Sequence, residues 1–238
     1  TDSDVPYNNI VALNENGATL HYQYKNFDKP REHRSLLIDA GAEVAGYASD
    51  ITRTLSNGDT RFTDLVNALD DEQLALASKV RANTDYRDLH LECHLRVGSV
   101  LKALDIVDMD PGSMMEAGVT STFFPHGLGH LIGLQVHDVA GFAADETGAL
   151  IPKPNGHPYL RMTRTLEPGM VVTIEPGIYF IPTLLAKLKA SKHSSIVNWR
   201  NVEHLTAFGG ARIEDEVHCT NGKPENLTRD AFAEIENA

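Results

Sequence analysis

Two aspartates eleven positions apart, Asp39 and Asp50, constrain the fold more than any other feature of the chain. Asp39 ends one strand-like run, 35–39, and Asp50 lies within a second, 46–54. The midpoint between the two lies between Val44 and Ala45. A hairpin that turns there would place the carboxylates opposite each other on one face, within reach of one cation. Two surface acids at strand ends are an equally open interpretation.

The remaining pattern mixes strands and helices. Strands are expected over residues 10–13, 35–39, 46–54, 169–175 and 211–219. Apolar side chains at helical spacing predict helices over 62–80 and 89–104, with further helix within 181–207 and over 228–237. An Asn-Gly pair predicts a hairpin between 10–13 and 19–24. Because strands dominate the ends and helices the middle, we expect an α+β fold.

Composition narrows the possible functions. The 238 residues suit one globular domain over 1–238. A net charge of −12 argues against a nucleic-acid partner, since polyphosphate binding needs excess Lys and Arg. No apolar run approaches the ~18 residues of a membrane span. Two cysteines give no disulfide framework, which favours a reducing compartment and hence the cytoplasm.

Three histidines, His126, His130 and His137, fall within twelve positions and are interspersed with glycines. Glycine permits close approach of the backbone, and neutral imidazole is a common metal ligand. A lone histidine is usually an ordinary polar residue, but this cluster indicates a site. The His-Glu-x-x-His arrangement of single-zinc proteases is absent from the sequence, which disfavours that class.

In the C-terminal half of the chain, two acidic residues belong to strand-like runs, Glu175 and Glu214. Glu175 shares a face with apolar Val171, and a carboxylate there costs free energy unless it is paired or metal-bound. Taken alone, the run 212–216 is better interpreted as a charged edge strand.

Carboxylates with histidine and without cysteine suit Mn²⁺, Co²⁺ or Zn²⁺. Four carboxylates carry more charge than one divalent ion needs, so two ions are expected, and a pair can stabilise the charge that develops during hydrolysis.

Four motifs in this order resemble the pita-bread metallopeptidases, and among them the bacterial prolidases (Xaa-Pro dipeptidases), which include organophosphorus acid anhydrolases. The motifs are Ile38-Asp39-Ala40-Gly41 with Asp50-Ile51-Thr52-Arg53-Thr54, His126-Gly127-Leu128-Gly129-His130 with Val136-His137-Asp138, Leu166-Glu167-Pro168-Gly169-Met170 with Glu175-Pro176-Gly177, and Gly210-Ala211-Arg212-Ile213-Glu214-Asp215.

The resemblance implies a pita-bread catalytic domain with two divalent ions, manganese being favoured over cobalt or zinc. Its implied metal ligands are Asp39, Asp50, His130, Glu175 and Glu214. Asp50 and Glu214 would bridge both ions, Asp39 would complete one, and His130 with Glu175 the other. A hydroxide bridging the ions would attack the carbonyl before proline, Glu175 would handle its proton, and His137 would steady the tetrahedral intermediate.

The resemblance also implies a substrate pocket. His21 and Arg161 match residues that grip the carboxylate of the terminal proline, and an Arg fork suits a carboxylate. His126 matches a further pocket histidine, and Arg212 a residue that positions a ligand. The pocket-lining residues would include Tyr86 and Leu160. Arg161 could instead be a solvated loop cation, and Tyr86 and Leu160 could be core residues.

The function implied is hydrolysis of Xaa-Pro dipeptides, with phosphotriester hydrolysis as a side activity. The alternatives are release of the first residue from longer Xaa-Pro peptides, as by aminopeptidase P, and a pita-bread binding module without catalysis. The family normally carries an N-terminal domain and a first catalytic-domain helix, and both are expected to be missing from this stretch. A homodimer is expected for the full-length protein.

Overall fold

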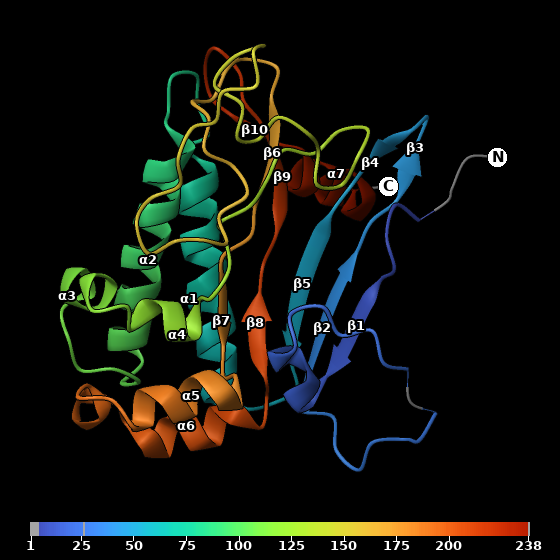
Figure 1. Ribbon diagram of the computed structural model, residues 1–238. Helices are drawn as coiled ribbons and strands as arrows, with labels where there is room; N and C mark the ends of the chain where they lie inside the picture. The colour runs from blue at the N-terminus through green and yellow to red at the C-terminus, as the bar shows by residue number, and fades with distance from the viewer. Residues whose placement is uncertain (1–4, 26, 238) are drawn as a thin grey trace.

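The computed structural model describes residues 5–25 and 27–237, and Figure 1 shows the arrangement of its elements. The helices are α1 (Thr60–Ala77), α2 (Tyr86–Ala103), α3 (Pro111–Glu116), α4 (Thr120–Phe123), α5 (Pro182–Lys189), α6 (Trp199–Thr206) and α7 (Leu227–Glu236), with the 3-10 helices η1 (Asn14–Ala18) and η2 (Ser194–Ile196). The strands are β1 (Ile10–Leu13), β2 (Ser35–Ala40), β3 (Glu43–Val44), β4 (Tyr47–Ala48), β5 (Ile51–Ser56), β6 (Val171–Ile174), β7 (Gly177–Tyr179), β8 (Gly210–Arg212), β9 (Asp215–His218) and β10 (Glu225–Asn226).

The strands form antiparallel sheets, which agrees with the expected α+β class. One sheet has the order β1-β2-β5 and another the order β10-β9-β6, while β3-β4 and β7-β8 are short pairs. An isolated antiparallel bridge between Thr52 and Glu214 connects the first sheet to the segment between β8 and β9. In Figure 1, α1 and α2 lie on one side of the strands and α5 and α6 lie across their lower end.

The helical layer is built from amphipathic helices with side-chain caps. Asp59 accepts a hydrogen bond from the Phe62 amide at the start of α1, and Asp85 accepts one from the Arg87 amide at the start of α2. The apolar faces of these helices bury side chains such as Phe62 and Leu65 against the strands. Burial of such a side chain stabilises the fold by about 1.5–3 kcal/mol. No helix among the described residues is long and apolar enough to span a bilayer.

The hairpin predicted between 10–13 and 19–24 is wrong. β1 pairs with β2 instead, and the Asn-Gly pair lies in η1. The side chain of Asn14, whose φ is 55°, accepts hydrogen bonds from the Arg34 and Ser35 amides and donates one to the Glu32 carbonyl. These distant partners turn the chain away from a hairpin.

At three places the chain leaves one strand and enters the next after a break of two residues, and each break contains an acidic residue. Asp50 lies between β4 and β5, Glu175 between β6 and β7, and Glu214 between β8 and β9. Pro176 follows Glu175 and has no amide to donate, which helps end the ladder there. The edge-strand interpretation of 212–216 is wrong for β9, because this strand pairs with β10 on one side and β6 on the other. The interruptions aim carboxylates out of the sheets toward a common centre.

Candidate metal centre

All five residues expected to bind metal line one cavity of about 720 Å³. The five come from β2, from the three strand interruptions, and from the loop after α4. They are Asp39, Asp50, His130, Glu175 and Glu214. Segments far apart in the sequence therefore bring their oxygen and nitrogen atoms to one place.

The closest group within this cavity is Asp50, His130 and Glu214, which offer ligand atoms that all lie within 4.8 Å of one another. The Nε2 atom of His130 lies 3.5 Å from Asp50 Oδ2 and 3.5 Å from Glu175 Oε1. Asp50, His130 and Glu214 are buried, and the Glu175 side chain is 17% exposed. The four residues form a compact set of oxygen and nitrogen donors.

The register places Asp39 and Asp50 diagonally rather than directly opposite. Asp39 pairs with Thr52, because the hairpin turns at Ala45 and Gly46, one residue later than expected. Both turn residues have positive φ, 54° and 81°, as tight two-residue hairpins require. A shift of two residues preserves the face of a strand, so both carboxylates still line the cavity.

The orientation of His130 is fixed by its surroundings. Its Nδ1–H donates to the Leu131 carbonyl at 2.9 Å, and its amide donates to Thr173 Oγ1 at 3.0 Å. Gly129 permits this approach, because a Cβ atom there would lie 2.2 Å from the Thr173 carbonyl oxygen. Since Nδ1 carries the hydrogen, Nε2 faces Asp50 and Glu175 and is available to a cation.

Arg212 is buried in the wall of the cavity and positions two acids. Its NH2 group donates to Asp39 Oδ2 at 2.6 Å, and its Nε–H donates to Thr52 Oγ1 at 3.1 Å. The Thr52 hydroxyl in turn donates to Glu214 Oε2 at 2.6 Å. The other oxygen of Asp39, Oδ1, is buried without a hydrogen-bond partner among the described residues.

The electrostatics of the site favour a bound cation. Burial, together with the nearby Asp50 and Glu175 charges, raises the pKa of Glu214 well above its ordinary value. Burial raises the pKa of Glu175 to about 7 and also raises that of Asp39. Burial acts in the same direction on Asp50, but the neighbouring His130 ring, the hydrogen bond from Tyr7 and the charge of Arg212 outweigh it and hold that pKa below its ordinary value.

Divalent cations would offset the repulsion between these buried carboxylates. The donor set is rich in carboxylates and includes an imidazole nitrogen and the partnerless Asp39 oxygen. Such hard donors suit Mn²⁺, Co²⁺ or Zn²⁺. The residues present therefore fit a divalent metal centre.

His126 and His137 flank the acids in different ways. The Nδ1–H of His126 donates to the Gly127 carbonyl, and its Nε2 accepts from the Tyr179 hydroxyl at 2.9 Å. Burial lowers the pKa of His126 to about 3, so the ring is neutral. His137 stacks edge-on against His130 with ring centroids 4.4 Å apart, and partial burial lowers its pKa to about 4.

The residues expected in the substrate pocket divide into two groups. His21, Arg161 and Arg212 line the cavity, and His21 and Arg161 are exposed. Tyr86 and Leu160 are not among the described residues that line it, and both belong to the buried core. Each is fully buried, and the Tyr86 hydroxyl donates to the Thr173 carbonyl at 2.7 Å.

Two polar residues that contact Asp50, Tyr7 and Glu216, were not expected to belong to the site. The Tyr7 hydroxyl donates to Asp50 Oδ1 at 2.6 Å, although the residues are 43 positions apart. The Asp50 amide donates to Glu216 Oε1 at 2.5 Å. Glu216 had a weak signal, since it shares a strand face with Glu214 by the period of two.

Comparisons with known proteins agree with this geometry. The model of metallopeptidase family M24 matches residues 2–221. The chain is 55% identical over 232 residues to an Xaa-Pro dipeptidase of Xanthomonas euvesicatoria, covering 97% of this chain and 53% of that protein. It is 53% identical over 232 residues to one of Stenotrophomonas maltophilia, covering 97% of this chain and 52% of that protein. The chain thus spans about half the length of the curated relatives it matches.

Solved structures extend the comparison to the fold. Zinc-substituted Escherichia coli aminopeptidase P in complex with product superposes with a TM-score of 0.74 at 30% identity, covering 98% of this chain and 47% of that one. The same enzyme with the inhibitor Pro-Leu gives 0.73 at 31% identity, with the same coverage. The fold is therefore the pita-bread fold.

Proposed function

Because the chain belongs to metallopeptidase family M24, we propose that it carries the catalytic centre of an Xaa-Pro dipeptidase, which hydrolyses the peptide bond before a C-terminal proline. The observation that supports this most directly is the convergence of Asp50, His130 and Glu214 in one cavity with Glu175 and Asp39. The similarity of the chain to two Xaa-Pro dipeptidases also supports the proposal. Residues 1–238 would form one catalytic domain.

Two divalent ions, manganese by preference, would be held by Asp39, Asp50, His130, Glu175 and Glu214. Carboxylate-rich donor sets favour Mn²⁺ over softer ions. When bound, a pair of ions supplies a nucleophile from water at neutral pH and polarises the scissile carbonyl. Asp50 and Glu214, whose ligand atoms lie within 4.8 Å of each other, would help to hold both ions. Asp39 would help to hold one ion, and His130 with Glu175 the other.

The side chains around the ions would manage protons and charge. Glu175 lies 3.5 Å from His130 within the donor set, and its carboxylate would take up a proton from the attacking water and return it. His137, which packs on His130 at the cavity, would donate a hydrogen bond to the tetrahedral intermediate. His126 has both ring nitrogens engaged, and its Nδ1 lies 3.9 Å from Glu175 Oε2, so it would act as a neutral wall beside Glu175.

Specificity for dipeptides would come from His21 and Arg161. Both line the same cavity as the acids, and neither side chain forms a hydrogen bond or ion pair with another residue that the structure describes. A cation at this place would bind the free carboxylate of the terminal proline. A longer peptide has no carboxylate there, so it would be bound less well.

Arg161 provides the test. Wild type is expected to cleave Gly-Pro better than Gly-Pro-Gly, and Arg161→Met should lower kcat/KM for Gly-Pro about 10- to 100-fold, as expected for loss of a charged hydrogen bond. Cleavage of Gly-Pro-Gly should change little. Arg164→Met is the matched control, since Arg164 belongs to the same loop but pairs with Glu167 outside the cavity.

A second candidate is aminopeptidase P-like release of the first residue from longer peptides, favoured by the structural match to the Escherichia coli enzyme. Preference of wild type for Gly-Pro-Gly would support it against the dipeptidase. Failure to take up any manganese would instead support a binding module without catalysis. The side activity on phosphotriesters, the cytoplasmic location and the homodimer of the full-length protein stay predictions from the sequence.

A further inference from the structure

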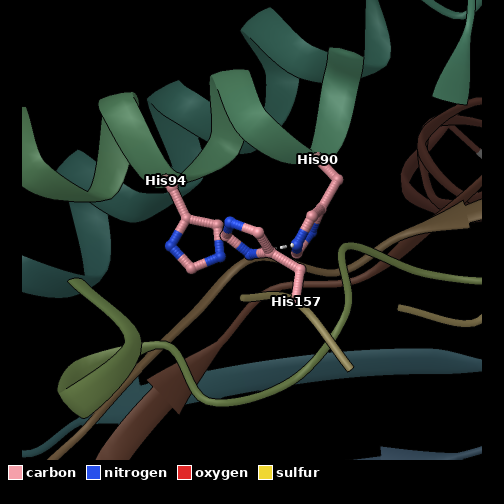
Figure 2. Close-up of side chains that lie close together, drawn as sticks. All are labelled: His90, His94 and His157. Atoms are coloured by element: carbon pink, nitrogen blue, oxygen red, sulfur yellow. Dashed lines mark hydrogen bonds between the residues drawn. The ribbon is translucent and has the colours of Figure 1, made fainter. Parts of the chain in front are cut away.

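Three histidines outside the carboxylate centre lie against one another (Figure 2). His90 and His94 are one turn apart on α2, and both project toward His157, which lies in the long loop between α4 and β6. His90 and His94 are about 1% exposed and His157 is partly buried. A helix pair at i and i+4 with a third ligand from a loop is a common way to build a histidine metal site.

The rings are close enough to share one ion. The Nε2 atom of His90 lies 2.9 Å from Nδ1 of His157. Ring centroids are 4.8 Å apart for His90 and His94, 4.7 Å for His90 and His157, and 4.5 Å for His94 and His157. One nitrogen from each ring lies within 4.8 Å of the others. Ligands of a tetrahedral ion with bonds of about 2.0–2.1 Å lie roughly 3.3 Å apart, so small side-chain rotations suffice.

We propose that His90, His94 and His157 form a second metal site, which binds a borderline transition-metal ion such as Zn²⁺. The adjoining cavity of about 190 Å³ is lined by no acidic residue among those the structure describes. Imidazole suits zinc, copper and nickel, whereas carboxylate suits manganese. The two sites of this chain would therefore prefer different ions.

The neighbours of each ring leave nitrogen atoms free for an ion. His94 Nδ1 lies 2.8 Å from Thr120 Oγ1, and when this nitrogen donates to the hydroxyl, Nε2 keeps its lone pair. His90 Nε2 and His157 Nδ1 share a hydrogen bond that can run in either direction, and an ion would replace it. His90 Nδ1 is buried without a partner among the described residues. A buried imidazole nitrogen without a partner is costly, and such a group calls for a physical explanation.

The charge state of the rings supports metal binding. Burial lowers the pKa of His90 to about 2 and that of His94 to about 3, and it also lowers the pKa of His157. Burial therefore disfavours the protonated form of each ring, and a neutral imidazole is the form that binds a metal ion.

An ion at this place would tie the loop to α2. Next along the chain from His157, Pro158 and Tyr159 line both this cavity and the large one, and Arg161 follows. His126 also lines both. The proposed site is therefore a structural anchor for the wall of the large cavity, whether or not that cavity is a dipeptidase centre.

Metal content tests the site. Wild type, His157→Gln and the matched control His33→Gln are each loaded with Zn²⁺ and, separately, Mn²⁺, freed of excess metal by gel filtration, and assayed by mass spectrometry. His157 lies in a partly exposed loop and His33 is exposed, so neither change disrupts the core. We expect one zinc equivalent fewer in His157→Gln than in the other two proteins, and equal manganese in all three.

Equal zinc in all three proteins would overturn the proposal. A zinc-edge anomalous peak in wild-type crystals should lie between the three rings, and its absence from saturated crystals would also overturn it. The zinc comparison tests only the histidine site. If it failed, the manganese content and the peptidase assay would still test the proposed dipeptidase function separately.

Discussion

Arg212 lies in the wall of the cavity beside Asp39, and its NH2 group donates to Asp39 Oδ2 at 2.6 Å. The same guanidinium holds Thr52 and donates to the Tyr179 hydroxyl at 2.9 Å. One buried cation thus orients a carboxylate on β2 while leaving its Oδ1 atom without a partner among the described residues. An arginine in this role sets the geometry of the donor set.

Arg212→Lys should weaken manganese binding about 10- to 100-fold, the usual effect of losing an outer partner of a metal ligand. Lysine keeps the charge but cannot donate to Asp39, Thr52 and Tyr179 in the same planar arrangement. Isothermal titration with Mn²⁺ measures the change. Arg164→Lys is the control, and unchanged affinity in Arg212→Lys would contradict the role given to the guanidinium.

Tyr7→Phe should also weaken manganese binding, by up to about 10-fold, because the hydroxyl that donates to Asp50 Oδ1 at 2.6 Å is removed. Burial, with the charges of Asp50 and Asp39, raises the pKa of Tyr7, so the hydroxyl stays a donor at neutral pH. Tyr159→Phe, an exposed tyrosine at the mouth of the cavity, serves as the control. Equal affinities for both variants would show that the Tyr7 hydrogen bond is dispensable.

Asp50→Asn should reduce peptidase activity more than about 100-fold. Loss of a residue that only contacts a metal ligand reduces activity about 10- to 100-fold, and Asp50 is expected to contact the ions directly. The change removes a charge from the group formed with His130 and Glu214 but preserves the side-chain shape. Turnover of Gly-Pro by the manganese-loaded protein is the measurement, with circular dichroism to verify folding. Asp145→Asn, on the surface, should behave as wild type, and near-normal turnover of Asp50→Asn would refute its place among the ligands.

Asp215→Asn should destabilise the fold by about 3–5 kcal/mol, as expected when a buried ion pair loses one partner. Asp215 is fully buried and accepts from Arg53 at 2.6 Å and from Arg229 at 2.7 Å. Burial raises its pKa, but the charges of Arg53 and Arg229 and the hydrogen bonds from Arg229 and Asn226 outweigh this and hold it below 3.8.

The pH dependence of this loss has a definite sign. A carboxylate with a lowered pKa in the folded state stabilises the protein above its unfolded pKa, and this contribution disappears as the pH falls through the folded pKa. The difference in unfolding free energy between wild type and Asp215→Asn should therefore be largest at neutral pH and shrink below pH 3.8. Urea unfolding at several pH values measures this difference. A difference that grows as the pH falls would contradict the ion-pair account.

Local patterns predicted most of the regular structure because burial repeats at the helical and strand periods. The helices expected over 62–80 and 89–104 correspond to α1 and α2, each starting a few residues earlier at an aspartate cap. Period alone cannot find interruptions, so 46–54 and 211–219 were expected as unbroken strands. Asp50 and Glu214 lie where those strands break.

The site could be predicted in part. The spacing of Asp39 and Asp50 indicated one face, but the turn residues Ala45 and Gly46 shifted the register by two. The ligand set came from resemblance, since the contacts that unite it span distant segments. Tyr7 could not be predicted either, because it contacts Asp50 across 43 positions and no spacing rule relates the two residues. The interval between His90 and His94 was visible, yet only the fold brings His157 to them.

Anomalous diffraction from manganese-soaked crystals tests the central claim most directly. We predict two manganese peaks about 3.5–4 Å apart, both within the group formed by Asp50, His130 and Glu214, with Asp39 and Glu175 at the two ends. A single peak, or peaks away from these five side chains in fully soaked crystals, would contradict the account.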